Sequence, residues 1–128
     1  MRIDHIAIWT SDLEKMRTFY QLYFHAKCGK KYENLDKGFS SYFLSFDAGS
    51  RIEIMTRKDI TFKIGEKDLL NGYTHLAISV GTREEVSFLT EQLRVDGCKI
   101  VCEPRTTGDG YFESVILDPE GNHIEITE

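Results

Sequence analysis

An internal repeat sets the architecture of this chain. The residues Asp4–Ile8 (DHIAI) recur 70 positions later as Thr74–Ile78 (THLAI), and Gly49–Ile54 (GSRIEI) recurs 72 positions later as Gly121–Ile126 (GNHIEI). Each half therefore opens with a histidine in an apolar stretch and closes with a glutamate in an apolar stretch. Self-similarity of this kind is the signature of a repeated structural unit. We interpret the sequence as a tandem duplication.

The hydrophobic pattern of each half predicts a strand, a helix and three further strands. In the first half we expect a strand over 2–10, a helix from a cap at Ser11 or Asp12 to Phe24, and strands over 28–33, 40–47 and 51–56. In the second half the same order falls on a strand over 74–80, a helix from Thr82 to Gly97, and strands over 99–103, 112–117 and 123–127. The predicted fold class is α+β, with tandem βαβββ repeats that form a curved mixed sheet.

The length of 128 residues suits one domain. We expect it to consist of a first repeat over 1–56, a polar linker over 57–72 with a helical turn near Leu69, and a second repeat over 73–128.

The charge balance excludes some partners. The net charge is −5 and no basic cluster is present, which argues against binding to nucleic acid or to an anionic membrane. No apolar run approaches the roughly 20 residues of a membrane span, and the segment Met1–His5 lacks the apolar core of a signal peptide. Cys98 and Cys102 could form a weak metal pair, but their spacing in a strand favours small apolar side chains. With three cysteines, reduced thiols and a cytoplasmic location are expected.

Strand alternation places the repeated ionisable residues on one face of each half. His5 shares a strand face with Trp9, and His75 occupies the matching position in the second half. Glu53 and Glu125 alternate with isoleucines, where an unpartnered carboxylate is costly to bury. If the strand faces converge, two imidazoles and two carboxylates meet at one point. The sequence therefore predicts a divalent metal site formed by His5, Glu53, His75 and Glu125.

Each of these residues has an ordinary explanation when taken alone, as a core or surface side chain. Their recurrence at matching positions of both halves favours the metal site. His25 and His123 have no histidine at the equivalent position. We expect His25 to be exposed. His123 shares the face of Glu125 and matches Arg51 in the first half, and it either orients a ligand, contacts the substrate or has no role in the site.

The chain resembles the glyoxalase I / vicinal oxygen chelate superfamily over essentially its whole length. The paired βαβββ halves, the four His and Glu residues and the segment Tyr111–Ile126 (YFESVILDPEGNHIEI) carry this resemblance. The Asp-Pro-x-Gly-Asn-x-Ile-Glu motif is typical of the superfamily and leaves the reaction open. Members include glyoxalase I, methylmalonyl-CoA epimerase, extradiol dioxygenases, fosfomycin-modifying transferases and metal-free bleomycin-binding proteins.

The His-Glu-His-Glu set resembles that of glyoxalase I. Extradiol dioxygenases and fosfomycin transferases typically use two His and one Glu, and the epimerases commonly have Gln where this chain has Glu53. The resemblance implies a Ni²⁺, Co²⁺ or Zn²⁺ ion and a small-molecule substrate such as the hemithioacetal of methylglyoxal. Glu125 or Glu53 would take a proton from one substrate carbon, and a carboxylate would return it to the neighbouring carbon. The alternatives are another metalloenzyme of the superfamily (an epimerase, a dioxygenase or a thiol transferase) and a small-molecule-binding protein without catalysis.

Position 9 departs from the pattern of bacterial glyoxalase I, in which a basic residue four positions after the first His holds a glutathione carboxylate. Trp9 at this position implies a flatter, more apolar ligand or a thiol other than glutathione. The alternative is that the indole packs inside the barrel.

The resemblance also implies that the halves of one chain pair with those of a second chain. A strand face with Tyr42, Leu44 and Phe46, or with their alternates, is too apolar to leave exposed. A linker of about 16 residues allows the halves to lie side by side. We expect a homodimer with metal sites at the interface, or else a monomer whose own halves enclose one site.

Overall fold

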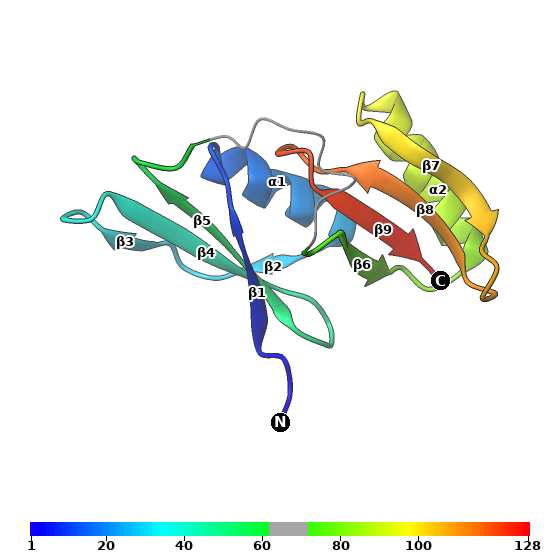
Figure 1. Cartoon of the computed structure of the whole chain (residues 1–128), viewed down its shortest axis with the longest axis horizontal. Coiled ribbons are helices and arrows are strands. Elements are labelled where there is room, and N and C mark those ends of the chain that lie inside the picture. Colours follow the sequence, from blue (N-terminus) through cyan, green and yellow to red (C-terminus); the bar gives the residue numbers. More distant parts are fainter. Residues whose placement is uncertain (62–71) are drawn as a thin grey trace. The chain divides into compact units, whose positions relative to one another are not determined.

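The structure, a computed structural model, describes residues 1–61 and 72–128. The chain divides into two compact units, Met1–Lys63 and Ile64–Glu128. The elements of the first unit are β1 (His5–Trp9), α1 (Leu13–Phe24), β2 (Lys27–Cys28), β3 (Tyr32–Asn34), β4 (Phe39–Ser45) and β5 (Arg51–Arg57). Those of the second are β6 (His75–Ser79), α2 (Arg83–Val95), β7 (Ile100–Thr106), β8 (Phe112–Leu117) and β9 (His123–Thr127) (Figure 1). The α+β class and the repeated strand–helix–strands order are confirmed. The expected helical turn near Leu69 lies outside the described residues.

Each unit forms its own sheet, and the two sheets have the same topology. The strand order is β1-β5-β4-β2 in the first, with β3 also paired to β4, and β6-β9-β8-β7 in the second. The first strand of each unit runs parallel to the last: β1 pairs with β5, and β6 pairs with β9. The register is also the same, because Ala7 lies opposite Glu53 and Ala77 lies opposite Glu125.

Both helices begin at capping residues that the sequence contains. Of the two candidates for α1, the structure selects Asp12, whose carboxylate accepts a hydrogen bond from the Lys15 backbone N–H at 2.9 Å. Thr82 and Glu85 form a reciprocal capping box at the start of α2. These bonds satisfy backbone donors that the first turn of a helix leaves free.

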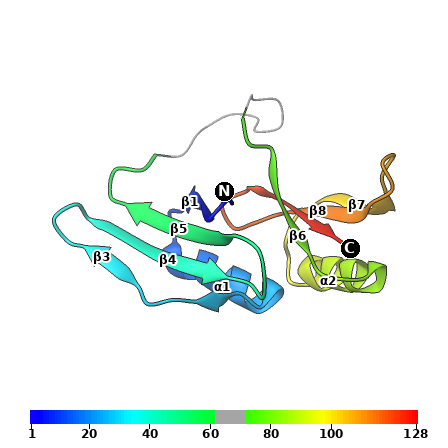
Figure 2. The same cartoon turned by 90° about the horizontal axis from the view of Figure 1, so that it is seen from below.

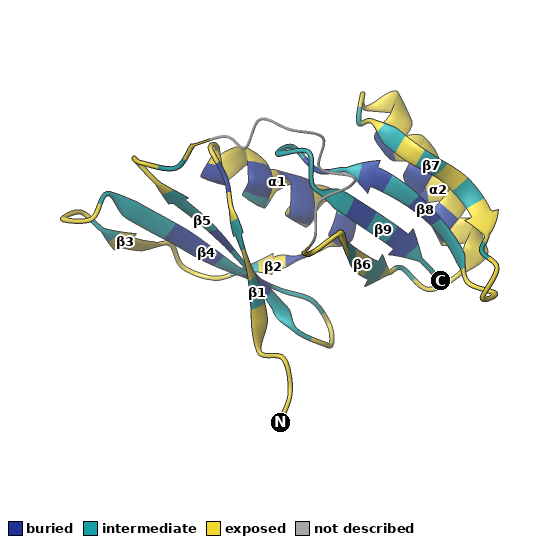
Figure 3. Ribbon diagram, viewed as in Figure 1, coloured by how far each residue is buried: buried dark blue, intermediate teal, exposed yellow. Residues whose placement is uncertain are grey.

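Each helix covers one face of its own sheet (Figures 2 and 3). The apolar residues that alternate with the ionisable ones are buried on this face: Ile52 and Ile54 in β5, and Ile124 and Ile126 in β9. In the second unit a buried hydrogen bond of 2.6 Å joins the hydroxyls of Thr90 in α2 and Ser114 in β8. The residues that alternate with these, including the predicted metal ligands, lie on the opposite face of each sheet.

The expected strand over 28–33 is interrupted. Lys27–Cys28 and Tyr32–Asn34 form two short strands, and their register against β4 shifts by one residue, from Cys28 opposite Leu44 to Tyr32 opposite Ser41. Both short strands still pair antiparallel with β4.

Of the two faces left open for β4, the structure places Tyr42 and Leu44 on the face towards α1 and their alternates on the open face. Tyr42 and Leu44 are both buried against α1, and the Tyr42 hydroxyl donates a hydrogen bond of 3.0 Å to Glu14. The alternates Phe39 and Phe43 lie on the other face of β4. None of the described helices is long and apolar enough to cross a membrane.

Leu93 and Leu22 give a matched test of this arrangement. The side chain of Leu93 in α2 is fully buried (0% exposed), whereas Leu22 in α1 is 56% exposed. We expect Leu93→Ala to lower the free energy of unfolding by about 2–5 kcal/mol, because it leaves a cavity in the core. Leu22→Ala should change it by less than about 0.5 kcal/mol. Urea denaturation followed by circular dichroism measures both, and equal losses would contradict the observed burial.

Candidate metal centre

The first unit brings His5 and Glu53 together. They project from the neighbouring parallel strands β1 and β5, on the face opposite α1. His5 Nε2 lies 3.8 Å from a carboxylate oxygen of Glu53, and the Glu53 side chain is only 17% exposed. Strand alternation explains this position, because Ile52 and Ile54 occupy the face under the helix. One imidazole and one carboxylate thus face the same space.

The second unit repeats this pair with His75 and Glu125. His75 Nε2 in β6 lies 3.5 Å from a carboxylate oxygen of Glu125 in β9, whose side chain is 18% exposed. The two units therefore present equivalent pairs at equivalent positions of the same topology. Imidazole nitrogen and carboxylate oxygen are donors that suit Zn²⁺, Ni²⁺ and Co²⁺, so the residues fit such an ion. Among residues 1–61 and 72–128, however, no three His, Cys, Asp or Glu side chains are grouped so as to hold a metal.

The residue before each histidine contacts its other ring nitrogen. The Asp4 carboxylate lies 3.0 Å from Nδ1 of His5 and also accepts a hydrogen bond from Arg51. The Thr74 hydroxyl lies 3.1 Å from Nδ1 of His75. The contacts with His5 and Arg51 hold the pKa of Asp4 below its usual value. A neighbour at Nδ1 orients the ring and leaves Nε2 available for a metal ion.

Trp9 lies on the same face of β1 as His5 and is 47% exposed. Its indole meets the Phe39 ring edge-on with centroids 6.2 Å apart, and Phe39 meets Tyr32 at 6.0 Å. These three residues, which we call the aromatic cluster, come from β1, β3 and β4. Only Trp9 was singled out by the sequence, because the cluster depends on strand pairing that local patterns do not reveal.

His123 pairs in register with His75 and shares the strand face of Glu125. Its match in the first unit is Arg51, which pairs with His5. His25 ends α1 in a left-handed conformation (φ 53°) and is exposed, as expected.

Sequence reasoning missed Glu113. This residue lies in β8, next to β9, and its side chain is on the same sheet face as that of Glu125. Burial and the charge of Glu125 raise its pKa, while Arg105, 3.9 Å away, acts in the opposite direction. The repeat search passed over Glu113 because its match in the first unit is Ser41. Glu113 could have been predicted from the antiparallel pairing of β8 with β9, which puts it on the same sheet face as Glu125.

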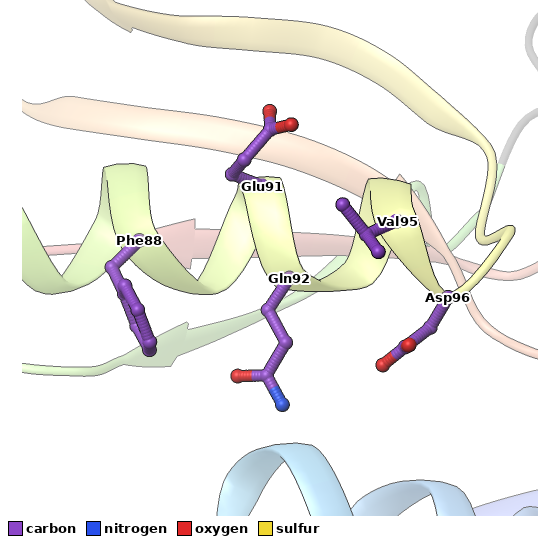
Figure 4. Close-up of a pocket in the computed structure, with 5 residues that line it drawn as sticks. All are labelled: Phe88, Glu91, Gln92, Val95 and Asp96. Atoms are coloured by element: carbon purple, nitrogen blue, oxygen red, sulfur yellow. The ribbon is translucent and has the colours of Figure 1, made fainter.

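A separate hollow of about 300 Å³ lies along α2, lined by Phe88, Glu91, Gln92, Val95 and Asp96 (Figure 4). It contains none of the residues predicted for the site. Phe88 and Val95 are 72% and 77% exposed, so they belong to the side of α2 turned away from its own sheet.

The duplicated βαβββ units and their His/Glu pairs agree with a match to a protein family. The family model of the Glyoxalase/Bleomycin resistance protein/Dioxygenase superfamily matches residues 2–126. The chain belongs to this superfamily.

The individual relatives share only a low sequence identity with this chain. The chain is 25% identical over 131 residues to the lactoylglutathione lyases of Salmonella typhimurium and Salmonella typhi, covering all of this chain and 93% of each relative. Glyoxalase I from Zea mays has a TM-score of 0.81 at 24% identity over 98% of this chain, which spans 44% of the maize chain. The trypanothione-dependent Leishmania major glyoxalase I has a TM-score of 0.80 at 22% identity, covering 100% of this chain and 86% of that one. A glyoxylase/bleomycin resistance protein/dioxygenase domain from Frankia sp. EAN1pec reaches 0.83 at 15% identity, covering 99% of this chain and 96% of that one. These structures share the fold.

The contact between Asp4 and His5 predicts a ring tautomer. An ionised carboxylate only accepts hydrogen bonds, so the neutral His5 ring should carry its proton on Nδ1. Replacing Asp4→Ala removes this acceptor and should shift His5 towards the tautomer protonated on Nε2. Nitrogen-15 NMR of the imidazoles at pH 8 distinguishes the two forms, with the exposed His25 as internal reference. The same tautomer in both proteins would contradict the orienting role of Asp4.

Proposed function

We propose that this protein is a glyoxalase I-type, metal-dependent isomerase with His5, Glu53, His75 and Glu125 as metal ligands. The observation that carries the proposal is the repetition of one His/Glu pair, on the face opposite the helix, in both units. A single such pair is common on protein surfaces, but a matched set of two imidazoles and two carboxylates has the donors of a divalent metal site. The 25% identity to lactoylglutathione lyase over the whole chain supports the same activity.

The ion in this proposal is Ni²⁺, Co²⁺ or Zn²⁺, and when bound it would polarise the oxygens of the substrate as a Lewis acid. The chain itself supplies the proton transfer. Glu53 or Glu125 accepts a proton from the carbon beside the substrate carbonyl, and a carboxylate delivers it to the neighbouring carbon. Both side chains are less than one-fifth exposed, which limits competing hydration of the carboxylates. His123 lies beside His75 and is proposed to contact the substrate.

The aromatic cluster supports an apolar subsite. The exposed indole of Trp9 shares the face of His5 and is held edge-on by Phe39. An aromatic surface next to the site favours a flat or apolar part of the ligand over a carboxylate. We propose that Trp9 contacts the thiol-derived part of a hemithioacetal, formed from glutathione or from a less charged thiol.

The thiols of the chain support a reducing compartment. Cys28, Cys98 and Cys102 are all free, and burial raises the pKa of Cys28 and Cys98. A raised pKa keeps these side chains in the unreactive thiol form. A cytoplasmic location is part of the proposal.

The decisive experiment measures metal content and isomerisation together. Protein reconstituted with Ni²⁺, Co²⁺ or Zn²⁺ should convert hemithioacetals of methylglyoxal, tested with several thiols, into the thioester product. His75→Ala should weaken metal binding at least tenfold. Glu53→Gln and Glu125→Gln retain an oxygen donor, and whichever residue acts as the base should lose activity while the metal is kept. His25→Ala, which changes an exposed histidine, is the matched control and should behave as the wild type.

Other outcomes identify the competing functions. Stable metal binding without isomerisation, combined with epimerase, ring-cleaving or thiol-transfer activity, would replace the proposed reaction by another of the superfamily. Small-molecule binding without metal or turnover would indicate a binding protein.

We also propose that the protein is a homodimer with two metal sites. Each site would take His5 and Glu53 from one chain and His75 and Glu125 from the other. The aromatic cluster on the open face of the first sheet includes the exposed side chains of Trp9 and Tyr32. Burial of this apolar surface against a second chain would favour the dimer. A symmetric dimer makes the same pairing twice, so two complete sites result.

Subunit mixing tests this arrangement. His5→Ala and His75→Ala chains each lack a proposed metal ligand and should be inactive alone, but they should regain activity when mixed, because a mixed dimer contains one site with no substitution. When equal amounts of the two chains pair at random, about half of the dimers are mixed and each of these has one intact site. About one quarter of all metal sites are then intact. No recovery after verified subunit exchange, or a monomer by sedimentation, would contradict the proposal.

A further inference from the structure

Arg51 connects the side chains that surround His5. Arg51 of β5 pairs in register with His5 of β1, so both side chains lie on the sheet face opposite α1. The Arg51 guanidinium donates a hydrogen bond to Oδ2 of Asp4. The same carboxylate oxygen lies 3.0 Å from Nδ1 of His5. Asp4 therefore bridges Arg51 and the imidazole of a proposed metal ligand.

Phe43 of β4 contacts both ends of this bridge. Its ring meets the His5 imidazole edge-on, with centroids 5.2 Å apart and an angle of 85° between the planes. The guanidinium carbon of Arg51 lies 4.4 Å from the centroid of the same Phe43 ring. A guanidinium over an aromatic face is attracted by the ring, which adds to the hold of its hydrogen bond. The four side chains form a closed ring of contacts, which we call the His5 clamp: Asp4, His5, Phe43 and Arg51.

The second unit has other residues at the three supporting positions of the clamp, namely Thr74, Val115 and His123. The Thr74 hydroxyl lies 3.1 Å from Nδ1 of His75, but a hydroxyl can donate or accept a hydrogen bond and therefore selects neither ring tautomer. A valine side chain offers no aromatic face to a cation. The two equivalent histidines therefore differ in what holds them.

A second cation near Asp4 is Arg2. Its guanidinium lies 3.9 Å from Oδ1 of Asp4, but the Arg2 side chain is 88% exposed, against 42% for Arg51. An ion pair between largely exposed side chains contributes little. Arg51, which is also stacked on Phe43, is the partner that restricts the Asp4 carboxylate.

We propose that Arg51 is a positioning residue that fixes the carboxylate of Asp4, which in turn holds the His5 ring with Nε2 directed towards the metal. This inference rests on the proposed function, since His5 is one ligand of the proposed site. The sign of the effect on metal affinity distinguishes this role from a simple charge effect. A positive charge near a cation site repels the ion, so removal of the charge alone would tighten metal binding. Loss of positioning would weaken it, because the groups that orient a metal-bound histidine typically contribute about 10- to 100-fold to metal affinity.

The test is a titration with Co²⁺, whose visible absorption reports the arrangement of the ligands. Asp4→Ala should raise the Co²⁺ dissociation constant about tenfold. Arg51→Gln should also raise it, by about threefold, and should alter the spectrum, because Asp4 remains but is less well fixed. In the Asp4→Ala background, Arg51→Gln should bring no further loss, because Arg51 acts through a residue that is no longer present.

Arg57→Gln is the matched control. Arg57 belongs to the same strand as Arg51 and has the same alternation, and its side chain is 43% exposed and pairs with Asp59. Its replacement removes the same charge from β5 without touching the His5 clamp, and it should leave the Co²⁺ dissociation constant and spectrum unchanged.

Nitrogen-15 NMR of the metal-free protein at pH 8 adds a measurement that needs no ion. Arg51→Gln should lower the fraction of His5 that is protonated on Nδ1 and leave the tautomer of His75 unchanged. Thermal unfolding of every variant separates a loss of the fold from a loss of positioning. A merely structural role of Arg51 would lower stability without altering the His5 tautomer or the Co²⁺ spectrum of the folded protein.

The outcomes separate this inference from the proposed function. If the wild type binds Co²⁺ and Arg51→Gln binds it equally or more tightly, the positioning role is wrong and the metal site stands. The role is also wrong if the double variant binds Co²⁺ more weakly than Asp4→Ala, or if Arg51→Gln leaves the His5 tautomer unchanged. If the wild type itself binds no Co²⁺, the proposed metal site and the positioning role fail together.

Discussion

The parallel pairing of the first and last strands of each unit is the interaction on which the rest depends. It joins residues almost fifty positions apart and brings the histidine of one strand beside the glutamate of the other. The helix covers one face of this pair, so the isoleucines must point towards it and the ionisable residues must point away. A slip of one residue would bury Glu53 or Glu125 under the helix, where an unpartnered carboxylate is costly. Core packing therefore maintains the register that defines the candidate site.

Duplication has kept this framework while the surrounding side chains diverged. The first unit places aromatic rings of Trp9, Phe39 and Tyr32 on the open face. The second has Ser79 where the first has Trp9, and it places Glu113 beside Glu125. The framework is shared because it is imposed by the cores, whereas the open faces are free to change.

Several sequence predictions agreed with the structure because they rest on local chemistry. The cap of α1 at Asp12 and that of α2 at Thr82 follow from side-chain acceptors beside an amphipathic segment. The strand faces of His5 and Glu53 follow from simple alternation. For β4 the sequence left open whether Tyr42 and Leu44 or their alternates face away from the helix, because alternation gives two faces without saying which one the helix covers. That choice depends on how α1 packs, and the hydrogen bond between Tyr42 and Glu14 marks the side it took.

The repeat in the sequence was sufficient to establish two βαβββ units with a histidine and a glutamate at equivalent places in each. The element order could be predicted because helical and strand periodicities are local features of the sequence. The same pattern also occurs in both halves, so each half supports the assignment made for the other. Tertiary structure alone decided which side chains meet across strands. It placed Asp4 against Arg51, joined the aromatic cluster, and brought Glu113 to the sheet face of Glu125. These contacts depend on the register between strands distant in sequence, which no local pattern encodes.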